Sequence, residues 1–130
     1  ATVIAEFGGF DSNLKSNGDT VLSRKISSKY KVIYQSNIIV LHPARYEVRE
    51  LTAKYKRLLG GIYTRKYKKK PIKFLKHLIT FILRRYRFAI KKFITVSWKE
   101  SKAIFKVCHS INKSAISEYF KLINGGSTAR

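Results

Sequence analysis

The 130-residue sequence contains no methionine, one cysteine, two prolines and only seven acidic residues. The single thiol, Cys108, excludes an internal disulfide and a cysteine-rich metal site. The sequence has no run of about 18 uncharged apolar residues, so no transmembrane helix is predicted. It begins with Ala and shows no signal peptide at that point. The missing methionine and this start lead us to expect a piece of a longer chain.

The few acidic residues stand against 28 Lys and Arg, which gives a formal charge of +21. This charge is uneven, because residues 1–62 hold 10 basic and 5 acidic side chains whereas residues 63–130 hold 18 and 2. So basic a second part predicts a polyanionic partner, either an anionic lipid surface, nucleic acid or a phosphate-bearing substrate. Since 45% of the residues are hydrophobic, the chain can also bury a core.

Turn, helix and strand patterns alternate over the first part of the chain. They first predict a strand or short helix at 1–7, an irregular loop, and a helix at 19–28. A strand or strand pair at 31–42 follows and is stopped by Pro43. The last predicted element of this part is a helix at 47–61 that ends at Gly60 and Gly61. Strands mixed with helices indicate an α/β fold for this part.

The second part of the chain is predicted to be purely helical. Pro71 suits the first turn of a long helix over residues 71–94. Ser97, with Glu100 three residues later, forms a capping-box signature for a last helix that runs to Asn124. The apolar faces of these two helices could pack together as a hairpin with a basic outer surface. The closing residues, GGSTAR, are expected to fray.

A loop near the start carries a recognisable order of residues. Gly8-Gly9-Phe10-Asp11 is followed by Gly18-Asp19, then Leu22 and Arg24, and later by Val40-Leu41-His42-Pro43 and KYKRLLGG. This set resembles the C-terminal part of the catalytic domain of family 2 glycosyltransferases, which have the GT-A fold, over about residues 3–62. The resemblance implies an α/β fold class, with an acceptor-side portion of a GT-A domain at residues 1–62 and a basic amphipathic helical extension at residues 63–130.

The resemblance also implies roles for single residues. Asp19 would be the catalytic base of an inverting transfer, because an acceptor hydroxyl becomes a good nucleophile only when a carboxylate takes its proton. The other residues that it implicates are Gly8, Gly9, Phe10, Asp11 and Arg24 in substrate binding and His42 as a metal ligand.

Plain structural roles stay open for the same positions. Asp19 could only cap its helix, Asp11 could bond to the backbone of its own turn, and Arg24 could be an exposed helix cation or pair with Asp19. A histidine at the end of a strand, such as His42, could equally be structural.

The sequence departs from the family pattern at Ser12, Gly18 and Ala44 and lacks the nucleotide-binding half with its Asp-x-Asp motif. A divalent metal, Mn²⁺ or Mg²⁺, would be bound mainly by that missing half. The prediction is therefore a glycosyltransferase fragment that is inactive alone. The whole enzyme would move a sugar from a nucleotide-diphosphate sugar to a saccharide or lipid-linked acceptor in polysaccharide biosynthesis.

Residues 71–94 mix Phe, Ile and Leu with Lys and Arg, as is typical of a helix that lies in a membrane interface. We therefore expect an anionic membrane surface as a partner and a cytoplasmic, peripheral location at the inner face of the membrane. The alternative is a basic module that binds nucleic acid or that only associates with membranes or other partners. Nucleic acid is the less favoured partner, because no zinc-finger, KH or RRM signature occurs.

Overall fold

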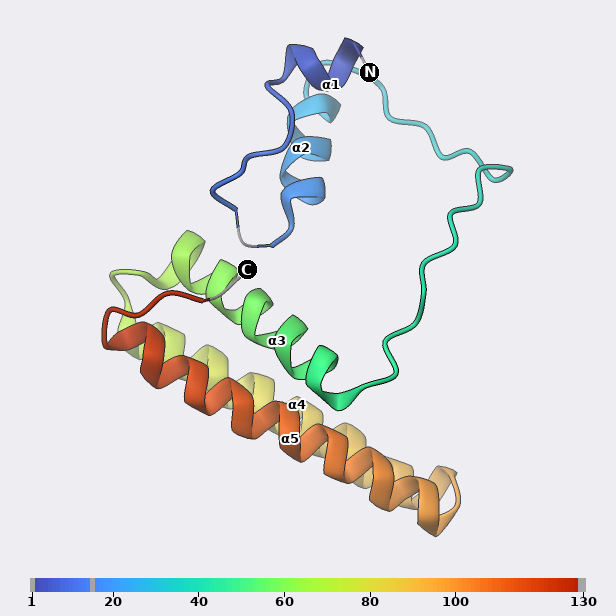
Figure 1. The fold of residues 1–130 in the computed structure, drawn as a ribbon, viewed down its shortest axis with the longest axis vertical. Coiled ribbons are helices and arrows are strands. Elements are labelled where there is room, and N and C mark those ends of the chain that lie inside the picture. Colours follow the sequence, from blue (N-terminus) through green and yellow to red (C-terminus); the bar gives the residue numbers. More distant parts are fainter. Residues whose placement is uncertain (1, 15, 129–130) are drawn as a thin grey trace. The chain divides into compact units, whose positions relative to one another are not determined.

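The computed structural model describes residues 2–14 and 16–128, and the chain divides into two units, Ala1–Arg45 and Tyr46–Arg130 (Figure 1). The described elements are α1 (Thr2–Glu6) and α2 (Gly18–Ser27) in the first unit, and α3 (Val48–Ile62), the π-helical turn η1 (Tyr63–Tyr67), α4 (Pro71–Thr95) and α5 (Trp98–Ile123) in the second. The predicted boundary between functional parts at residue 62 stays a prediction, and it coincides with the last residue of α3.

The predicted α/β fold is wrong, because no strand occurs in residues 2–14 or 16–128. Residues 31–42, predicted as a strand or strand pair, form an irregular segment in which the Ile38 N–H donates to the Gln35 carbonyl at 3.2 Å. Their β-branched side chains favour extended backbone, but a strand also needs a neighbour to exchange hydrogen bonds with. The described residues provide no such neighbour, and Leu41 is left 90% exposed.

The first unit is a pair of short helices, and α2 confirms the predicted helix at residues 19–28. The Glu6 carboxylate accepts hydrogen bonds from the Lys29 ammonium group and from the Tyr30 hydroxyl, the latter at 2.7 Å. These bonds, first from Lys29 and then from Tyr30, lower the pKa of Glu6. The rings of Phe7 and Tyr30 meet edge to face at 6.2 Å. The end of α2 is thereby tied to the end of α1.

In the second unit, α4 and α5 form an antiparallel hairpin, which the sequence left open as one alternative for these two helices, and α3 packs along α5 (Figure 1). The predicted capping box is confirmed at the start of α5. The Ser97 hydroxyl accepts from the Glu100 N–H at 3.3 Å, and the Glu100 carboxylate accepts from the Ser97 N–H at 3.2 Å. Two backbone donors that the helix itself leaves without partners are thus satisfied.

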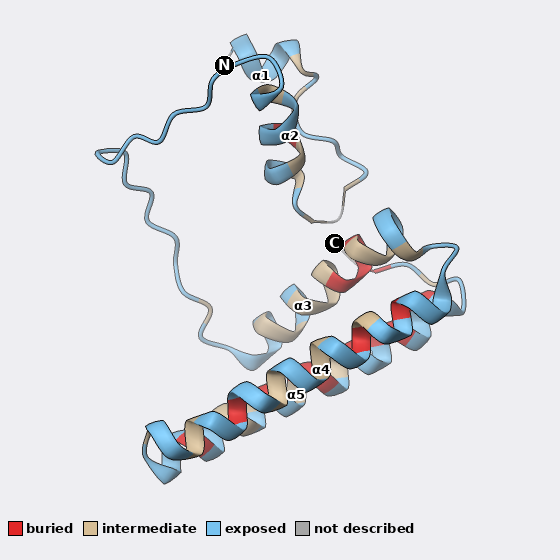
Figure 2. Cartoon of the chain, turned by 180° about the vertical axis from the view of Figure 1, so that it is seen from behind, coloured by how far each residue is buried: buried red, intermediate tan, exposed pale blue. Residues whose placement is uncertain are grey.

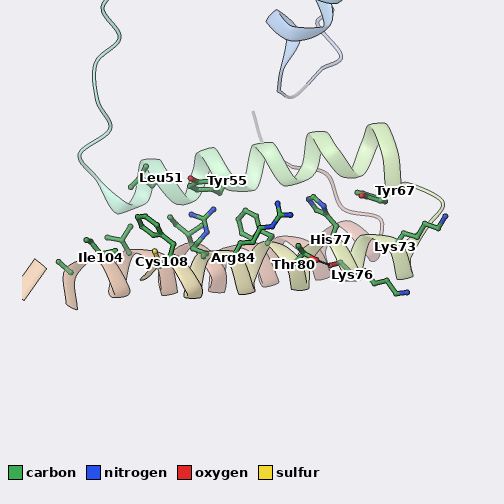
Figure 3. Close-up of a pocket in the computed structure, with 16 residues that line it drawn as sticks. Leu51, Tyr55, Tyr67, Lys73, Lys76, His77, Thr80, Arg84, Ile104 and Cys108 are labelled. Atoms are coloured by element: carbon green, nitrogen blue, oxygen red, sulfur yellow. Dashed lines mark hydrogen bonds between the residues drawn. The ribbon is translucent and has the colours of Figure 1, made fainter. Parts of the chain in front are cut away.

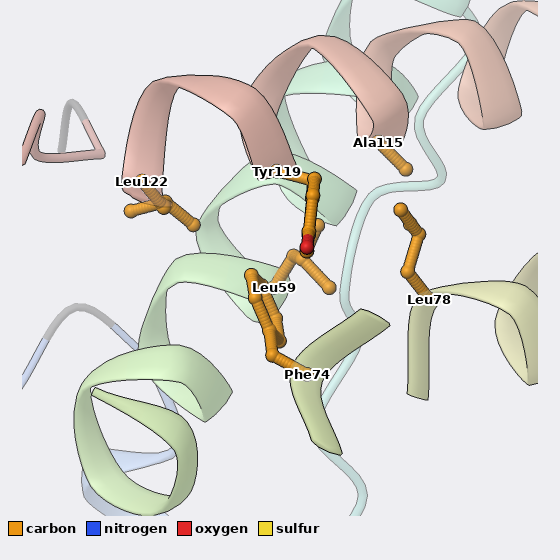
Figure 4. Close-up of a cluster of buried hydrophobic side chains, with 6 residues drawn as sticks. All are labelled: Leu59, Phe74, Leu78, Ala115, Tyr119 and Leu122. Atoms are coloured by element: carbon orange, nitrogen blue, oxygen red, sulfur yellow. The ribbon is translucent and has the colours of Figure 1, made fainter. Parts of the chain in front are cut away.

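The hydrophobic core lies where α3, α4 and α5 meet (Figure 4). Phe74 is completely buried, and its ring centroid lies 4.8 Å from that of Tyr63 and 5.1 Å from that of Tyr119. The remaining members of the buried cluster are Leu59, Leu78, Ala115 and Leu122. Aromatic pairs at such distances add to the stabilisation from burial alone. Away from this cluster, most surfaces of α4 and α5 are exposed (Figure 2).

The end of α3 and the C-terminal tail both differ from the prediction. The helix does not end at Gly60 and Gly61, since α3 runs to Ile62 and continues into η1. The chain after α5 is not frayed up to Thr128, which is only 6% exposed and donates its hydroxyl hydrogen bond to the Glu118 carboxylate.

Two glycines explain how this tail docks. Gly125 has φ +84°, a left-handed conformation that ends α5 and turns the chain back. At Gly60, an added Cβ would lie 1.9 Å from the Thr128 Oγ1. The absence of a side chain at Gly60 therefore makes room for the tail instead of ending the helix.

Candidate functional site

A groove runs between α3 and α4, with α5 as its floor (Figure 3). It forms because α3 and α4 both pack on α5. Its cavity volume is about 1040 Å³, at the upper end of the range typical of small-molecule sites. The lining residues are Leu51, Tyr55, Tyr67, Lys73, Lys76, His77, Thr80, Phe81, Arg84, Arg85, Phe88, Ala103, Ile104, Val107, Cys108 and Ile111.

The floor of the groove is apolar. Ile104, Val107, Cys108 and Ile111 recur at three- and one-residue spacing, which places them on one face of α5. The Cys108 side chain is almost fully buried. Burial raises the pKa of its thiol, and the positive charge of Arg85 opposes this shift in part. Cys108 is therefore a slow-reacting thiol that marks the floor of the groove.

The α4 wall of the groove is basic. It contributes Lys73, Lys76, Arg84 and Arg85, and no Asp or Glu is among the lining residues. The Arg85 guanidinium lies 4.0 Å from the ring centroid of Tyr55 on α3, a cation–π contact that holds it across the groove. Its Nε is buried and has no hydrogen-bond partner. The lining residues of the groove therefore carry a concentrated positive charge that no carboxylate among them balances.

His77 lies on the same wall, with its ring centroid 5.5 Å from that of Tyr67. Burial is the main reason that the pKa of His77 is lowered, and the positive charges of Lys66 and Arg84 lower it further. The imidazole is therefore uncharged at neutral pH. It adds a ring to the wall without adding to the charge.

A second surface lies on the other side of the α4–α5 hairpin. Along α4, exposed apolar side chains recur at spacings that place them on one helix face, and these are Ile72, Leu75, Ile79, Leu83, Ile90 and Ile94. Ile79 and the groove residue Phe81 are two positions apart, about 160° around the helix. The exposed row therefore points away from the groove.

The neighbouring face of α5 continues this surface with Trp98, Ile116 and Phe120, of which Trp98 is 65% exposed. Ile116 is five positions from the groove residue Ile111, about 140° around α5. We name the two rows together the outer apolar face. Exposed cations border it, namely Arg87 and Lys91 on α4 and Lys99, Lys102, Lys106 and Lys113 on α5.

The sequence pattern predicted a membrane-interface helix at residues 71–94, and it did not separate the outer apolar face from the groove. The spacing of the apolar residues contains the information that reveals a second apolar face, since a helix that packs against one partner needs only one apolar row. The groove could not be found in this way, because its other wall belongs to α3. Within residues 2–14 and 16–128, no helix has both the length and the apolar character needed to cross a membrane.

Asp19, the predicted catalytic base, is exposed in the first turn of α2. Its Oδ1 accepts a hydrogen bond from the Thr20 N–H at 2.8 Å. The N-cap of α2 is Asn17, which has φ +60°. Arg24 is also exposed, and it lies five positions along the helix, about 140° from Asp19. The helix thus separates these two side chains.

The predicted substrate loop is a turn. The Asp11 Oδ1 accepts from the Asn13 N–H at 2.9 Å, which is the turn role that the sequence left open. Gly8 and Gly9 have φ values of +75° and +68°, a conformation that favours glycine. Phe10 is 63% exposed, and its Cδ1 would lie 3.7 Å from a Cβ at Gly18. The loop therefore reaches the start of α2 through Phe10.

His42, the predicted metal ligand, is exposed, and its Nδ1 lies 3.0 Å from the Pro43 carbonyl oxygen. In the described part of the chain, no three His, Cys, Asp or Glu side chains gather as a group that could hold a metal ion. The resemblance assigned the metal mainly to residues outside this sequence, so the role of His42 as a metal ligand stays a prediction.

Comparison with protein-family models, curated proteins and solved structures finds no match for this chain. Together with the all-helical fold, this result overturns the resemblance to family 2 glycosyltransferases. Short Gly- and Asp-rich motifs match easily, because the same residues serve ordinary turns. The predicted enzyme activity, sugar donor, acceptor and metal lose the basis on which they were inferred.

Proposed function

We propose that the helical unit Tyr46–Arg130 is a peripheral membrane-binding module that attaches to anionic lipid surfaces through the outer apolar face and its basic borders. The observation that carries the proposal is the exposed apolar row on α4, which continues onto α5 and has cations on both sides. Exposed apolar surface with a polar rim is typical of an interaction site. The cytoplasmic leaflet is rich in anionic lipid, so we place the module there.

Charge and apolar area act together in this arrangement. Residues 46–130 contain 22 Lys and Arg against four Asp and Glu, and α4 contains no acidic residue. Each basic side chain near an anionic surface contributes about 1 kcal/mol. Apolar area that leaves water adds about 25 cal/mol per Å². Because the rows are parallel to the helix axes, the hairpin can lie flat, with its apolar side chains below the headgroups and its cations beside them.

The proposal is tested by sedimentation of the full chain with phosphatidylcholine vesicles that contain or lack phosphatidylserine. We expect binding only when phosphatidylserine is present. The triple variant Lys99→Glu/Lys102→Glu/Lys106→Glu removes three border cations, and at about 1 kcal/mol each its affinity should fall by about 100-fold or more. The matched control Lys54→Glu/Lys56→Glu/Arg57→Glu makes the same net charge change on α3 and should lose less than about tenfold.

A second pair of variants tests the apolar part. Leu83→Ser with Ile90→Ser keeps every charge and should weaken vesicle binding, because burial of the two side chains is lost. Circular dichroism checks that all variants stay helical. Equal losses for the two charge-reversal triples would contradict the assigned face. Tight binding to single-stranded RNA at physiological salt, with no binding to vesicles, would favour the nucleic-acid alternative instead.

A further inference from the structure

The groove between α3 and α4 lies on the opposite side of the hairpin from the outer apolar face, so the membrane proposal does not account for it. Its apolar and its basic lining residues come from different helices. The α5 floor offers apolar side chains such as Ile104, Val107 and Ile111, and the α4 wall offers Lys and Arg. A ligand that satisfies both must have an apolar body and a negative charge.

The groove also has a suitable length. The α4 wall runs from Lys73 to Phe88, which is about 22 Å at 1.5 Å per residue. A long alkyl chain can lie along such a floor, whereas a small inorganic anion would leave it bare. The floor has few hydrogen-bonding groups with which to recognise a polar molecule such as a nucleotide base.

Arg85 indicates where the negative charge would lie. Its guanidinium is held between elements, 4.0 Å from the Tyr55 ring centroid and 4.4 Å from that of Phe81. Its buried Nε has no partner, and buried polar groups in proteins are nearly always hydrogen-bonded. Arg84 beside it is exposed at the edge of the groove. A carboxylate or phosphate group can accept from guanidinium groups in the bidentate geometry that both anions favour.

We propose that the groove binds one single-chain anionic amphiphile, with its alkyl chain on the α5 floor and its carboxylate or phosphate head beside Arg84 and Arg85. The ligand class is therefore a long-chain fatty acid or a lysophospholipid with an acidic head. Binding requires no membrane, because the floor and the cations both belong to the folded helical unit.

Cys108 makes the proposal testable, since it is the single cysteine and lies in the floor. The rate at which N-ethylmaleimide labels the full chain is measured with oleate, with oleoyl lysophosphatidate and with oleyl alcohol, all below their aggregation concentrations. At about ten times the dissociation constant, a bound amphiphile should slow labelling by about tenfold, because only the free protein reacts. Comparison of the two anions shows which head is preferred. Oleyl alcohol has a similar chain without the charge and should protect much less.

Two variants locate the effect. Arg84→Glu should abolish protection by both anions, whereas Arg87→Glu, with the same charge change on the same helix but outside the groove, should keep it. Arg85 is left unchanged, because it packs on Tyr55 and Phe81. Isothermal titration calorimetry should give one oleate per chain for the wild type and for Arg87→Glu.

Three results would overturn the proposal. They are equal protection by oleyl alcohol, equal behaviour of Arg84→Glu and Arg87→Glu, and the absence of both protection and heat with either anion. The membrane proposal and the groove proposal can be tested separately, since the variant with Lys99, Lys102 and Lys106 changed to Glu should lose vesicle binding and keep protection of Cys108 by oleate. Arg84→Glu should do the reverse, apart from the small loss of affinity for vesicles that one charge brings.

Discussion

Gly60 and Thr128 show how one residue determines the fit of a distant segment. Gly60 lies inside α3, where glycine is a poor helix former, yet its missing side chain provides the space for the Thr128 hydroxyl. That hydroxyl in turn donates to Glu118, a carboxylate that is only 4% exposed. A buried carboxylate without such a donor would be destabilising. The three residues therefore act as a latch between α3, α5 and the C-terminal tail.

These contacts predict that the effect of Gly60→Ala on the free energy of unfolding changes sign with the residue at position 128. In the wild type, Gly60→Ala should lower the free energy of unfolding by about 1–3 kcal/mol, because the new methyl group overlaps Thr128. In a Thr128→Gly background the overlap is gone, and Gly60→Ala should instead raise the free energy of unfolding by up to about 1 kcal/mol through helix propensity. Urea unfolding followed by the fluorescence of Trp98 measures both. A loss of similar size in the two backgrounds would show that the tail does not dock on Gly60.

At the scale of single elements, the start of α5 depends on neighbouring residues in the sequence, whereas its middle depends on the helices packed against it. Its start is local, since Ser97 and Glu100 satisfy each other's backbone within one turn. Its middle depends on the partner helices, because Asn112 is only 1% exposed and neither polar atom of its amide has a hydrogen-bond partner. An isolated helix would give Asn112 water as a partner, and packing of the helices removes it.

Asn112→Leu is therefore expected to stabilise the helical unit. The change keeps roughly the same volume and removes an unpaired amide, so the free energy of unfolding should rise by about 1–3 kcal/mol in urea titrations. Ser117→Leu, an exposed position on the same helix, is the matched control and should change stability by less than about 0.5 kcal/mol. A destabilised Asn112→Leu would indicate that the amide has a partner, such as a buried water molecule.

The N-terminal elements illustrate where local signals fail. Residues 31–42 have strong β propensity, but no partner strand lies beside them in the described structure. The helix α2, whose pattern and first turn are local, formed at the expected place. Propensity thus predicted the helices of this chain better than its strands, because a helix completes its hydrogen bonds internally and a strand does not.

On the scale of the whole helical unit, burial couples its stability to pH through His77. The folded structure lowers the pKa of His77, mainly by burial, whereas the unfolded chain has the ordinary value near 6.5. The stability that depends on neutral His77 is therefore fully present above pH 6.5 and is lost as the pH falls from there through the lower pKa of the folded state, since in that interval the unfolded chain binds the proton more readily.

We expect the urea midpoint of the Trp98 transition to fall between about pH 7 and 5, and His77→Gln to flatten this dependence. His42→Gln changes an exposed histidine in the other unit and should leave the wild-type dependence in place. If both variants keep the full pH dependence, another group is responsible for it. If oleate fills the groove, the pH dependence of the wild type should weaken, because a nearby anion favours the protonated imidazole.

The sequence by itself determined the basic charge and the long helices that start near Pro71 and Ser97, because these follow from composition, local capping and apolar period. The pairing of these helices as a hairpin was one alternative that the sequence left open, and the tertiary structure decided it. Only the tertiary structure decided that the Gly60–Gly61 pair lies inside a helix, that Thr128 is buried and that residues 31–42 are not a strand. It also separated the apolar residues of α4 into a core, a groove wall and an exposed face. Each of these outcomes depends on which segment lies beside a residue, and residues such as Gly60 and Thr128 that meet in space are far apart in the sequence.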